Sequence, residues 1–277
     1  MPIVAANRSY GCRWSSERQA CVWAGELDGT REEDLRYVLP PDCLAQVPRA
    51  AASLAPIAQK AGIPLVAGET AMHAFGGLAG VTDHFVASFF YTAQLGYLAE
   101  AGAAHVARQT LVGGSYALLG RQNSSWQPRS DFWVAWLFRH LILGRGETAV
   151  LAQRAASEQP GVLTFAFCRK SETASEGDLG ALVVVNLSRQ RPTSLSLTWG
   201  GGKLPRKEWV LTGSVERGGS GMRINGVRPG WEASTAGTVA SAFPPRMAAA
   251  NSTVEVGPAT ILFAQQPGLS CAALAQE

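Results

Sequence analysis

At residues 63–70 the chain reads Ile63-Pro64-Leu65-Val66-Ala67-Gly68-Glu69-Thr70, a short apolar run that ends in a glycine and a carboxylate. A short apolar run bounded by Pro and Gly is typical of a buried strand. In parallel α/β sheets and barrels, active sites are built at the carboxyl ends of the strands. Glu69 is therefore a candidate catalytic residue, fixed at a strand end and open to a pocket. The alternative is a solvated loop acid that follows a buried strand.

Around this run, helix-like and strand-like segments alternate as far as about residue 146. The predicted order is helix, strand, helix, strand and helix, over residues 42–60, 65–67, 85–98, 103–107 and 130–144. We expect the three helices to begin at polar residues that cap them, namely Asp42, Thr82-Asp83 and Ser130-Asp131. This alternation predicts the closing units of a (β/α)8 TIM barrel, whereas residues 1–22 show no clear pattern.

After residue 147 the pattern changes to strands separated by Gly, Pro, Ser and Asn. The predicted strands are Val162–Phe167, Gly180–Leu187, Ser194–Trp199, Trp209–Thr212, Met222–Ile224, Thr253–Val256 and Ala259–Ala264. Short strands without long helices between them indicate an antiparallel β-sandwich. The predicted fold class is therefore α/β plus all-β, with a partial TIM barrel at residues 1–146 and a β-sandwich domain at residues 147–277.

Composition and motif spacing exclude several classes of function. The net charge of +3 and the scattered basic residues argue against a nucleic-acid partner. The sequence contains no run of 18 apolar residues, so we expect no transmembrane helix. The cysteines form no CxxC pair and the histidines no HExxH spacing, so we expect neither a metal site nor a cofactor. Four sequons, at Asn7, Asn123, Asn186 and Asn251, weakly favour a secretory route.

Further motifs follow Glu69 at fixed spacing. They are Phe75-Gly76-Gly77, Thr82-Asp83-His84-Phe85, Gln94-Leu95-Gly96, Arg108-Gln109, Gly113-Gly114-Ser115-Tyr116, Asp131-Phe132-Trp133 and Leu141 to Gly144. Together with Gly68-Glu69-Thr70, this set resembles the heparanase family. These are family 79 glycoside hydrolases, retaining β-glucuronidases on a TIM barrel with an appended β-sandwich. The resemblance runs from about residue 62 to residue 146, and is weaker in the sandwich, where it rests on Val184 to Ser188 and on two cysteines.

The resemblance implies a role for each residue of the set. Retaining glycosidases use two carboxyl groups about 5–5.5 Å apart, and Glu69 would be the nucleophile. Tyr116 would hydrogen-bond the nucleophile or the sugar, and Gln109 would bind a sugar hydroxyl or the uronate. The backbone amides of four glycines would approach the substrate carboxylate, namely Gly76, Gly77, Gly113 and Gly114. Taken singly, these residues also fit turn glycines, a core tyrosine and a solvated glutamine, but the spaced set favours a site.

Other residues keep two readings. Arg108 either faces the pocket or supports the barrel through an ion pair, and we favour the ion pair. His73 lines a subsite cleft or faces solvent. The resemblance also implies a disulfide between Cys168 and Cys271, with two buried free thiols as the alternative. It further implies a secreted glycoprotein, extracellular or in a lysosome or vacuole, with membrane association as an alternative.

Two departures from the family pattern concern the catalytic acid. The family carries its acid/base glutamate in an Asn-Glu-Pro segment and a His-x-Tyr segment on the strand before the nucleophile strand, and neither motif occurs here before Glu69. We expect the acid to lie outside this chain, and a missing N-terminal segment or a second chain to complete the barrel. Glu26 is a less favoured substitute. The predicted function is a glycoside hydrolase acting on glucuronic-acid-containing glycans; the alternative is an inactive or glycan-binding fragment.

Overall fold

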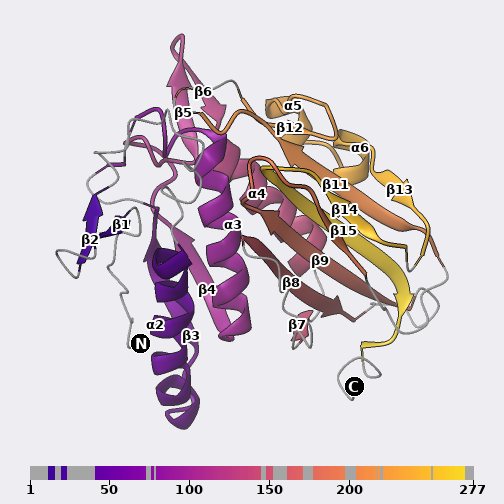
Figure 1. Cartoon of the computed structure of the whole chain (residues 1–277), viewed down its shortest axis with the longest axis horizontal. Helices are drawn as coiled ribbons and strands as arrows, with labels where there is room; N and C mark the ends of the chain where they lie inside the picture. Colours follow the sequence, from indigo (N-terminus) through magenta and orange to yellow (C-terminus); the bar gives the residue numbers. More distant parts are fainter. Residues whose placement is uncertain are drawn as a thin grey trace. The chain divides into compact units, whose positions relative to one another are not determined.

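Two compact units make up the chain. The computed structural model describes residues 12–15, 20–23, 41–72, 76–77, 79–144, 148–151, 161–170, 177–196, 204–216, 218, 221–250 and 252–271. The first unit holds residues 1–132 and 214–221, and the second holds residues 133–213 and 222–277 (Figure 1). The helix that begins at Ser130 runs from the first unit into the second. The predicted domain bounds of 1–146 and 147–277 stay a prediction.

A β-α-β arrangement forms the centre of the first unit. Two parallel strands are joined by a helix, and a second helix precedes them; Figure 1 shows both helices lying alongside the strands. The elements are α2 (Pro41–Lys60), β3 (Leu65–Thr70), α3 (Phe85–Glu100) and β4 (Ala103–Arg108). The predicted order of helices and strands is confirmed over this stretch. Because the pairing is parallel, β3 and β4 end at the same edge of the sheet.

Helix α3 is buried on nearly all sides, as a helix with apolar residues all round must be. Its N-cap residue is His84, which makes no side-chain hydrogen bond to the helix. The predicted cap by Thr82-Asp83 is therefore wrong. The Asp83 carboxylate instead accepts the backbone N–H of Gly80 at 2.7 Å and pairs with Nδ1 of His84 at 2.8 Å. The Asp83 carboxylate, which the sequence pattern predicted to cap the N-terminus of α3, thus forms hydrogen bonds within the turn before the helix.

An unpredicted hairpin follows β4. It consists of β5 (Leu119–Gln122) and β6 (Ser125–Pro128), which pair antiparallel. Asn123 and Ser124 form its two-residue turn with φ of 46° and 65°, the conformation of a type I′ turn. Asn-Gly is the usual signal for such a turn, and serine at the second position leaves no such signal in the sequence. In the same unit β1 (Cys12–Ser15) and β2 (Ala20–Trp23) form a separate antiparallel pair.

A seven-stranded antiparallel sheet forms the second unit, in the order β12-β11-β15-β9-β8-β7 with β13 also on β11. Its strands are β7 (Thr148–Leu151), β8 (Val162–Arg169), β9 (Asp178–Asn186), β11 (Arg206–Thr212), β12 (Arg223–Ile224), β13 (Arg246–Ala248) and β15 (Thr260–Leu269). A second sheet pairs β10 (Thr193–Leu195) with β14 (Val254–Val256). Each predicted strand overlaps an observed one, while the short β7 and β13 were not predicted.

Both faces of the large sheet are covered. On one face, apolar residues of β9 and β15 pack with Val254 and Val256 of β14. On the other face lies the end of α4 (Ser130–Leu137), which continues as the π-helix η2 (Phe138–Leu143). The rings of Phe138 and Phe167 are 5.7 Å apart, and Gln265 Nε2 donates to the carbonyl of Leu141 at 2.7 Å. This double cover explains why β9 is buried at every position from Gly180 to Asn186. The described residues of the unit also form α5 (Trp231–Ser234) and α6 (Val239–Ala242).

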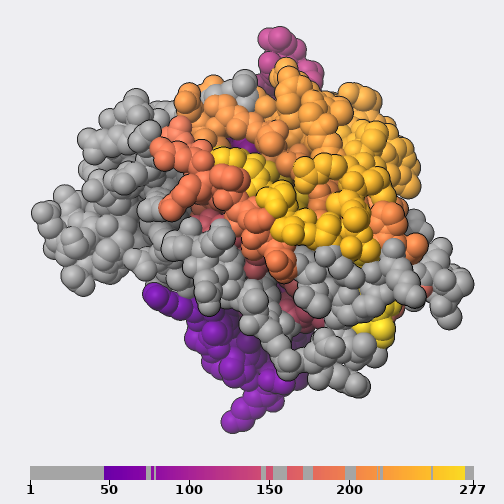
Figure 2. Space-filling model, turned by 45° about the vertical axis from the view of Figure 1, so that its right-hand side comes forward, coloured from indigo at the N-terminus to yellow at the C-terminus, as the bar shows by residue number. Residues whose placement is uncertain are grey.

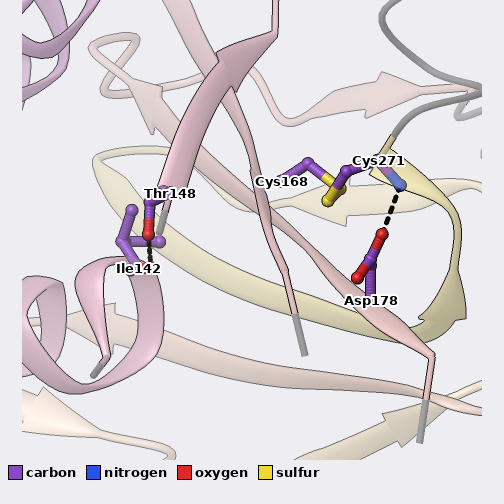
Figure 3. The surroundings of a disulfide bond; sticks show 5 residues. All are labelled: Ile142, Thr148, Cys168, Asp178 and Cys271. Atoms are coloured by element: carbon purple, nitrogen blue, oxygen red, sulfur yellow. Dashed lines mark hydrogen bonds between the residues drawn. A yellow bond between two sulfur atoms is a disulfide. The ribbon is translucent and has the colours of Figure 1, made fainter. Parts of the chain in front are cut away.

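A disulfide between Cys168 and Cys271 ties the end of β8 to the residue that follows β15, as the resemblance implies (Figure 3). The two Cα atoms are 5.5 Å apart and the sulfurs are buried. Asp178, at the start of β9, accepts the backbone N–H of Cys271 at 2.6 Å. The bridge joins residues 103 positions apart, a separation for which chain entropy corresponds to about 4–5 kcal/mol of stabilisation.

The antiparallel half of the predicted fold is therefore confirmed. In the first unit, β3 and β4 are the parallel strands of the described residues, and their place in a TIM barrel stays a prediction. Among the described helices, none has both the length and the apolar character needed to cross a membrane.

Candidate active site

Glu69 lies at the carboxyl end of β3 with its side chain exposed. Leu65 and Ala67 are buried, whereas Gly68 and Glu69 are exposed and Thr70 is buried again. Thr70 Oγ1 donates to the carbonyl of Ala107 at 3.0 Å, so the residue next to Glu69 is fastened to the neighbouring strand. The sequence prediction of a carboxylate held at a strand end agrees with this geometry.

Arg108, the last residue of β4, connects the parts of the candidate site. Its guanidinium donates to the carbonyls of Thr70 at 3.1 Å, Gln109 at 2.7 Å and Tyr116 at 2.9 Å. It also pairs with the Asp131 carboxylate at 2.7 Å, with side-chain exposures of 4 % and 3 %. Of the two readings of Arg108, the buried ion pair is the one that the structure shows.

Further groups surround this ion pair. Ser88 Oγ donates to the second oxygen of Asp131 at 2.9 Å. The Arg108 guanidinium lies 5.1 Å from the ring centre of Tyr91 and 6.0 Å from that of Tyr116. Burial raises the pKa of the Tyr91 phenol, which keeps this neighbour uncharged. Arg108 is thus enclosed by one carboxylate, backbone carbonyls and aromatic faces, a setting in which charge-assisted hydrogen bonds are strong.

Two glycine loops pack against each other beyond the ends of β3 and β4. Ser115 N–H donates to the carbonyl of Gly76 at 2.5 Å. A Cβ at Gly114, where φ is +73°, would lie 2.5 Å from that carbonyl oxygen. A Cβ at Gly77, where φ is +85°, would lie 2.7 Å from the backbone nitrogen of Tyr116. These close approaches of backbone to backbone require glycine, and they bring Gly76, Gly77, Gly114 and Tyr116 together.

The other predicted site residues lie close by in the fold. Gln109 is partly buried directly after β4, and its N–H donates to the carbonyl of Thr70 at 2.9 Å. Gly113 is exposed, with no atom near the position of a Cβ. Tyr116 is buried, at 7 % exposure. His73 and Phe75 lie outside the described residues, as does Glu26. The substrate roles of the set stay predictions.

Arg129 supports the loop of the candidate site, and sequence reasoning missed it. Its Nη1 donates to the carbonyls of Gly114 at 2.9 Å, Ser115 at 2.8 Å and Ala117 at 3.3 Å. Burial lowers the pKa of Arg129, against the opposite effect of Asp83 and Asp131. Arg129 therefore fixes the loop that carries Tyr116. A single arginine in a polar stretch after a proline offers no sequence signal for this role.

Asp83 forms a second polar contact beside these loops. Burial alone would raise the pKa of its carboxyl, but hydrogen bonds from His84 and from the N–H of Gly80 outweigh burial and hold the pKa below its usual value. Asp83 is therefore ionised at neutral pH.

Among the described residues, Cys168, Asp178 and Cys271 lie near enough to one another to hold a metal ion. The two sulfurs are bonded to each other, so this group offers no thiolate ligand.

Comparison with known proteins gives relatives over part of the chain. No protein-family model matches it. Heparanase-like protein 1 of Arabidopsis thaliana is 33 % identical over 120 residues, which are 43 % of this chain and 20 % of the relative. Heparanase-like protein 2 of the same plant is 29 % identical over the same shares. The chain is thus similar to heparanase-like proteins and spans about a fifth of the length of these curated relatives.

Solved structures share the fold at low identity. A family 51 α-L-arabinofuranosidase from Bifidobacterium longum matches 88 % of this chain and 52 % of its own, with a TM-score of 0.54 and 14 % identity. A family 51 arabinofuranosidase from Xanthomonas axonopodis pv. citri matches 81 % of this chain and 46 % of its own, with a TM-score of 0.52 and 13 % identity. The fold therefore occurs in glycoside hydrolases.

The packing of the glycine loops predicts unequal effects of two alanine substitutions. Gly113→Ala introduces a positive-φ alanine in open space and should cost about 1 kcal/mol. Gly114→Ala adds a clash with the backbone of Gly76, so we expect about 1–3 kcal/mol more. Thermal unfolding gives the stabilities, and hydrogen exchange at the Ser115 amide reports the contact between the loops. Equal stability and exchange in the two variants would contradict the packing.

The Arg108 network predicts that lysine cannot replace this arginine. A lysine ammonium lacks the planar fork that reaches several carbonyls and a carboxylate together. We expect Arg108→Lys to lower the free energy of unfolding by about 2–4 kcal/mol and to speed hydrogen exchange at Gln109. Arg121→Lys, at an exposed position of β5, is the matched control and should change stability by less than about 0.5 kcal/mol. Similar effects of both substitutions would show that Arg108 does not hold the site.

Proposed function

We propose that this chain carries the nucleophile side of a retaining glycoside hydrolase that acts on β-glucuronides in glycans. The observation that carries the proposal is the exposed Glu69 carboxylate at the carboxyl end of β3. The next residue, Thr70, is held through its carbonyl by Arg108 and Gln109. A nucleophile must be held in place, and these contacts fasten the backbone beside Glu69 to the neighbouring strand. The resemblance of residues 62–146 to family 79 glycosidases supports the choice of substrate.

The chemistry assigned to Glu69 proceeds in two steps. One carboxylate oxygen attacks the anomeric carbon, the glycosidic C–O bond breaks, and an acid protonates the leaving oxygen. Water then attacks the same carbon, gives a proton to the conjugate base of that acid, and breaks the ester bond to release the Glu69 carboxylate. Gln109 and Tyr116, which follow the neighbouring strand, would hydrogen-bond the sugar or the nucleophile. Their backbones are fixed by the same guanidinium.

Recognition of the uronate is assigned to the glycine loops. The substrate carboxylate needs hydrogen-bond donors, and backbone N–H groups in turns supply them without an added cation. Gly113 is exposed, with open space where a side chain would lie, so substrate can approach its backbone. Gly76, Gly77 and Gly114 shape the same pair of loops.

The remaining requirement is a second carboxyl group about 5–5.5 Å from Glu69. We assign this acid to a preceding segment or a second chain that completes the barrel. The buried disulfide supports an oxidising compartment. We therefore place the protein on the secretory route, at the cell exterior or in a lysosome or vacuole, with a glucuronic-acid-containing glycan as substrate.

A covalent trap tests Glu69 without the missing acid. In 2-deoxy-2-fluoro-β-D-glucuronyl fluoride, fluoride leaves with little protonation and the 2-fluoro group slows hydrolysis of the ester. Incubation should add one fluoroglucuronosyl group to the tryptic peptide that carries Glu69, detected by mass spectrometry. Glu69→Gln should abolish labelling, whereas Glu100→Gln, which alters an exposed glutamate at the end of α3, should leave it unchanged.

The trap also distinguishes the alternative function. A folded chain with an intact disulfide that takes up no label, or takes it up on another residue, would reject Glu69 as the nucleophile. An unlabelled chain that still binds a glucuronide column would favour the glycan-binding reading.

A further inference from the structure

The tip of the β5–β6 hairpin carries a sequon in a setting suited to modification. Asn123, Ser124 and Ser125 are all exposed, and Asn123 and Ser124 form the turn itself. Figure 1 shows the hairpin extending away from the helices of its unit, and Figure 2 shows its tip projecting at the top of that view. The side chains at this turn are therefore accessible to a glycosylating enzyme, which must bind both the asparagine and the serine two residues later.

Asn123 is exposed in the turn, so its side chain is not part of a packed core. The Ser125 hydroxyl donates to the carbonyl of Gln122 at 2.9 Å, across the base of the turn. The next residue, Trp126, is 45 % exposed.

Asn186, in a second sequon, has the opposite environment. It is fully buried at the end of β9, and its amide donates to the carbonyls of Arg191 at 2.9 Å, Val256 at 3.3 Å and Gly257 at 2.9 Å. Its oxygen accepts the N–H of Ser188 at 3.0 Å. A glycan on this nitrogen would displace core hydrogen bonds and has no space, so this sequon serves the fold. Asn7 and Asn251 lie outside the described residues.

We propose that Asn123 carries an asparagine-linked oligosaccharide and that Asn186 carries none. The Asn123 amide nitrogen attacks the first sugar's anomeric carbon in a lipid-diphosphate-linked oligosaccharide. An N–C bond forms, the bond from that carbon to the diphosphate oxygen breaks, the amide loses a proton and the lipid diphosphate leaves. The buried disulfide between Cys168 and Cys271 points to an oxidising compartment, where such glycans are attached. This inference does not depend on the proposed hydrolase activity.

The test is peptide mapping of the full chain after expression in a eukaryotic host behind a cleavable secretory signal. Trypsin should release Asn123 in the peptide 122–129 and Asn186 in the peptide 171–189. Amidase deglycosylation in ¹⁸O-water marks each formerly glycosylated asparagine as labelled aspartate. We expect the label in nearly all copies of 122–129 and in none of 171–189 from the secreted chain.

Two matched variants separate modification from folding. Asn123→Gln should remove one glycan, shift the gel band by one step and leave secretion unchanged. Asn186→Gln should leave the 122–129 glycopeptide intact while secretion falls, because core hydrogen bonds are lost. Unmodified Asn123 in the secreted chain, or a glycan on Asn186, would overturn the proposal. If the chain is retained in the cell, mapping of the microsome-translocated chain decides by the same criteria.

Discussion

The Arg108 guanidinium is buried against the Asp131 carboxylate, and its two terminal nitrogens also donate to the backbone carbonyls of Thr70 in β3, Gln109 directly after β4 and Tyr116 in the loop beyond. A buried charge is stable only when it is paired and hydrogen-bonded. Separating these segments would leave the buried guanidinium without its partners, which is unfavourable. The carbonyl of Thr70 belongs to the residue after Glu69, and that of Tyr116 belongs to the loop predicted to meet the sugar. One buried cation thus sets the position of the candidate nucleophile relative to its neighbours.

Local patterns predicted the elements but not their side-chain partners. The apolar run at residues 65–67 predicted β3 and the helix-like segment at residues 42–60 predicted α2, because such patterns depend on neighbours in sequence. The hairpin at residues 119–128 was not predicted, because its Asn-Ser turn lacks the glycine that usually signals such a turn. The expected cap at Asp83 was wrong because the Gly80 amide and His84 compete for the same carboxylate. Such competition depends on the path of the turn that brings the Gly80 amide to Asp83, and the spacing of residues in the sequence does not show that path.

In the candidate site, too, the sequence predicted positions but not the contacts between them. Glu69 was predictable because a carboxylate after a buried strand signals a strand-end position. Gly76 and Gly114 were expected to approach a substrate, yet the contact that requires glycine between them is backbone against backbone. Arg129, which holds three carbonyls of the loop, was missed. In the proposed chemistry this chain supplies the nucleophile and the sugar-facing loops, and a second carboxyl group supplies the acid.

The most direct test is a crystal structure of the chain after reaction with the fluoroglucuronyl fluoride. The account predicts a sugar ester on a Glu69 carboxylate oxygen, with the Tyr116 hydroxyl or the Gln109 amide within hydrogen-bond distance of the sugar. It also predicts that the sugar carboxylate faces the backbone of the loops at Gly76 and Gly113. An adduct on another residue, or a sugar on Glu69 that turns away from both loops into solvent, would contradict it.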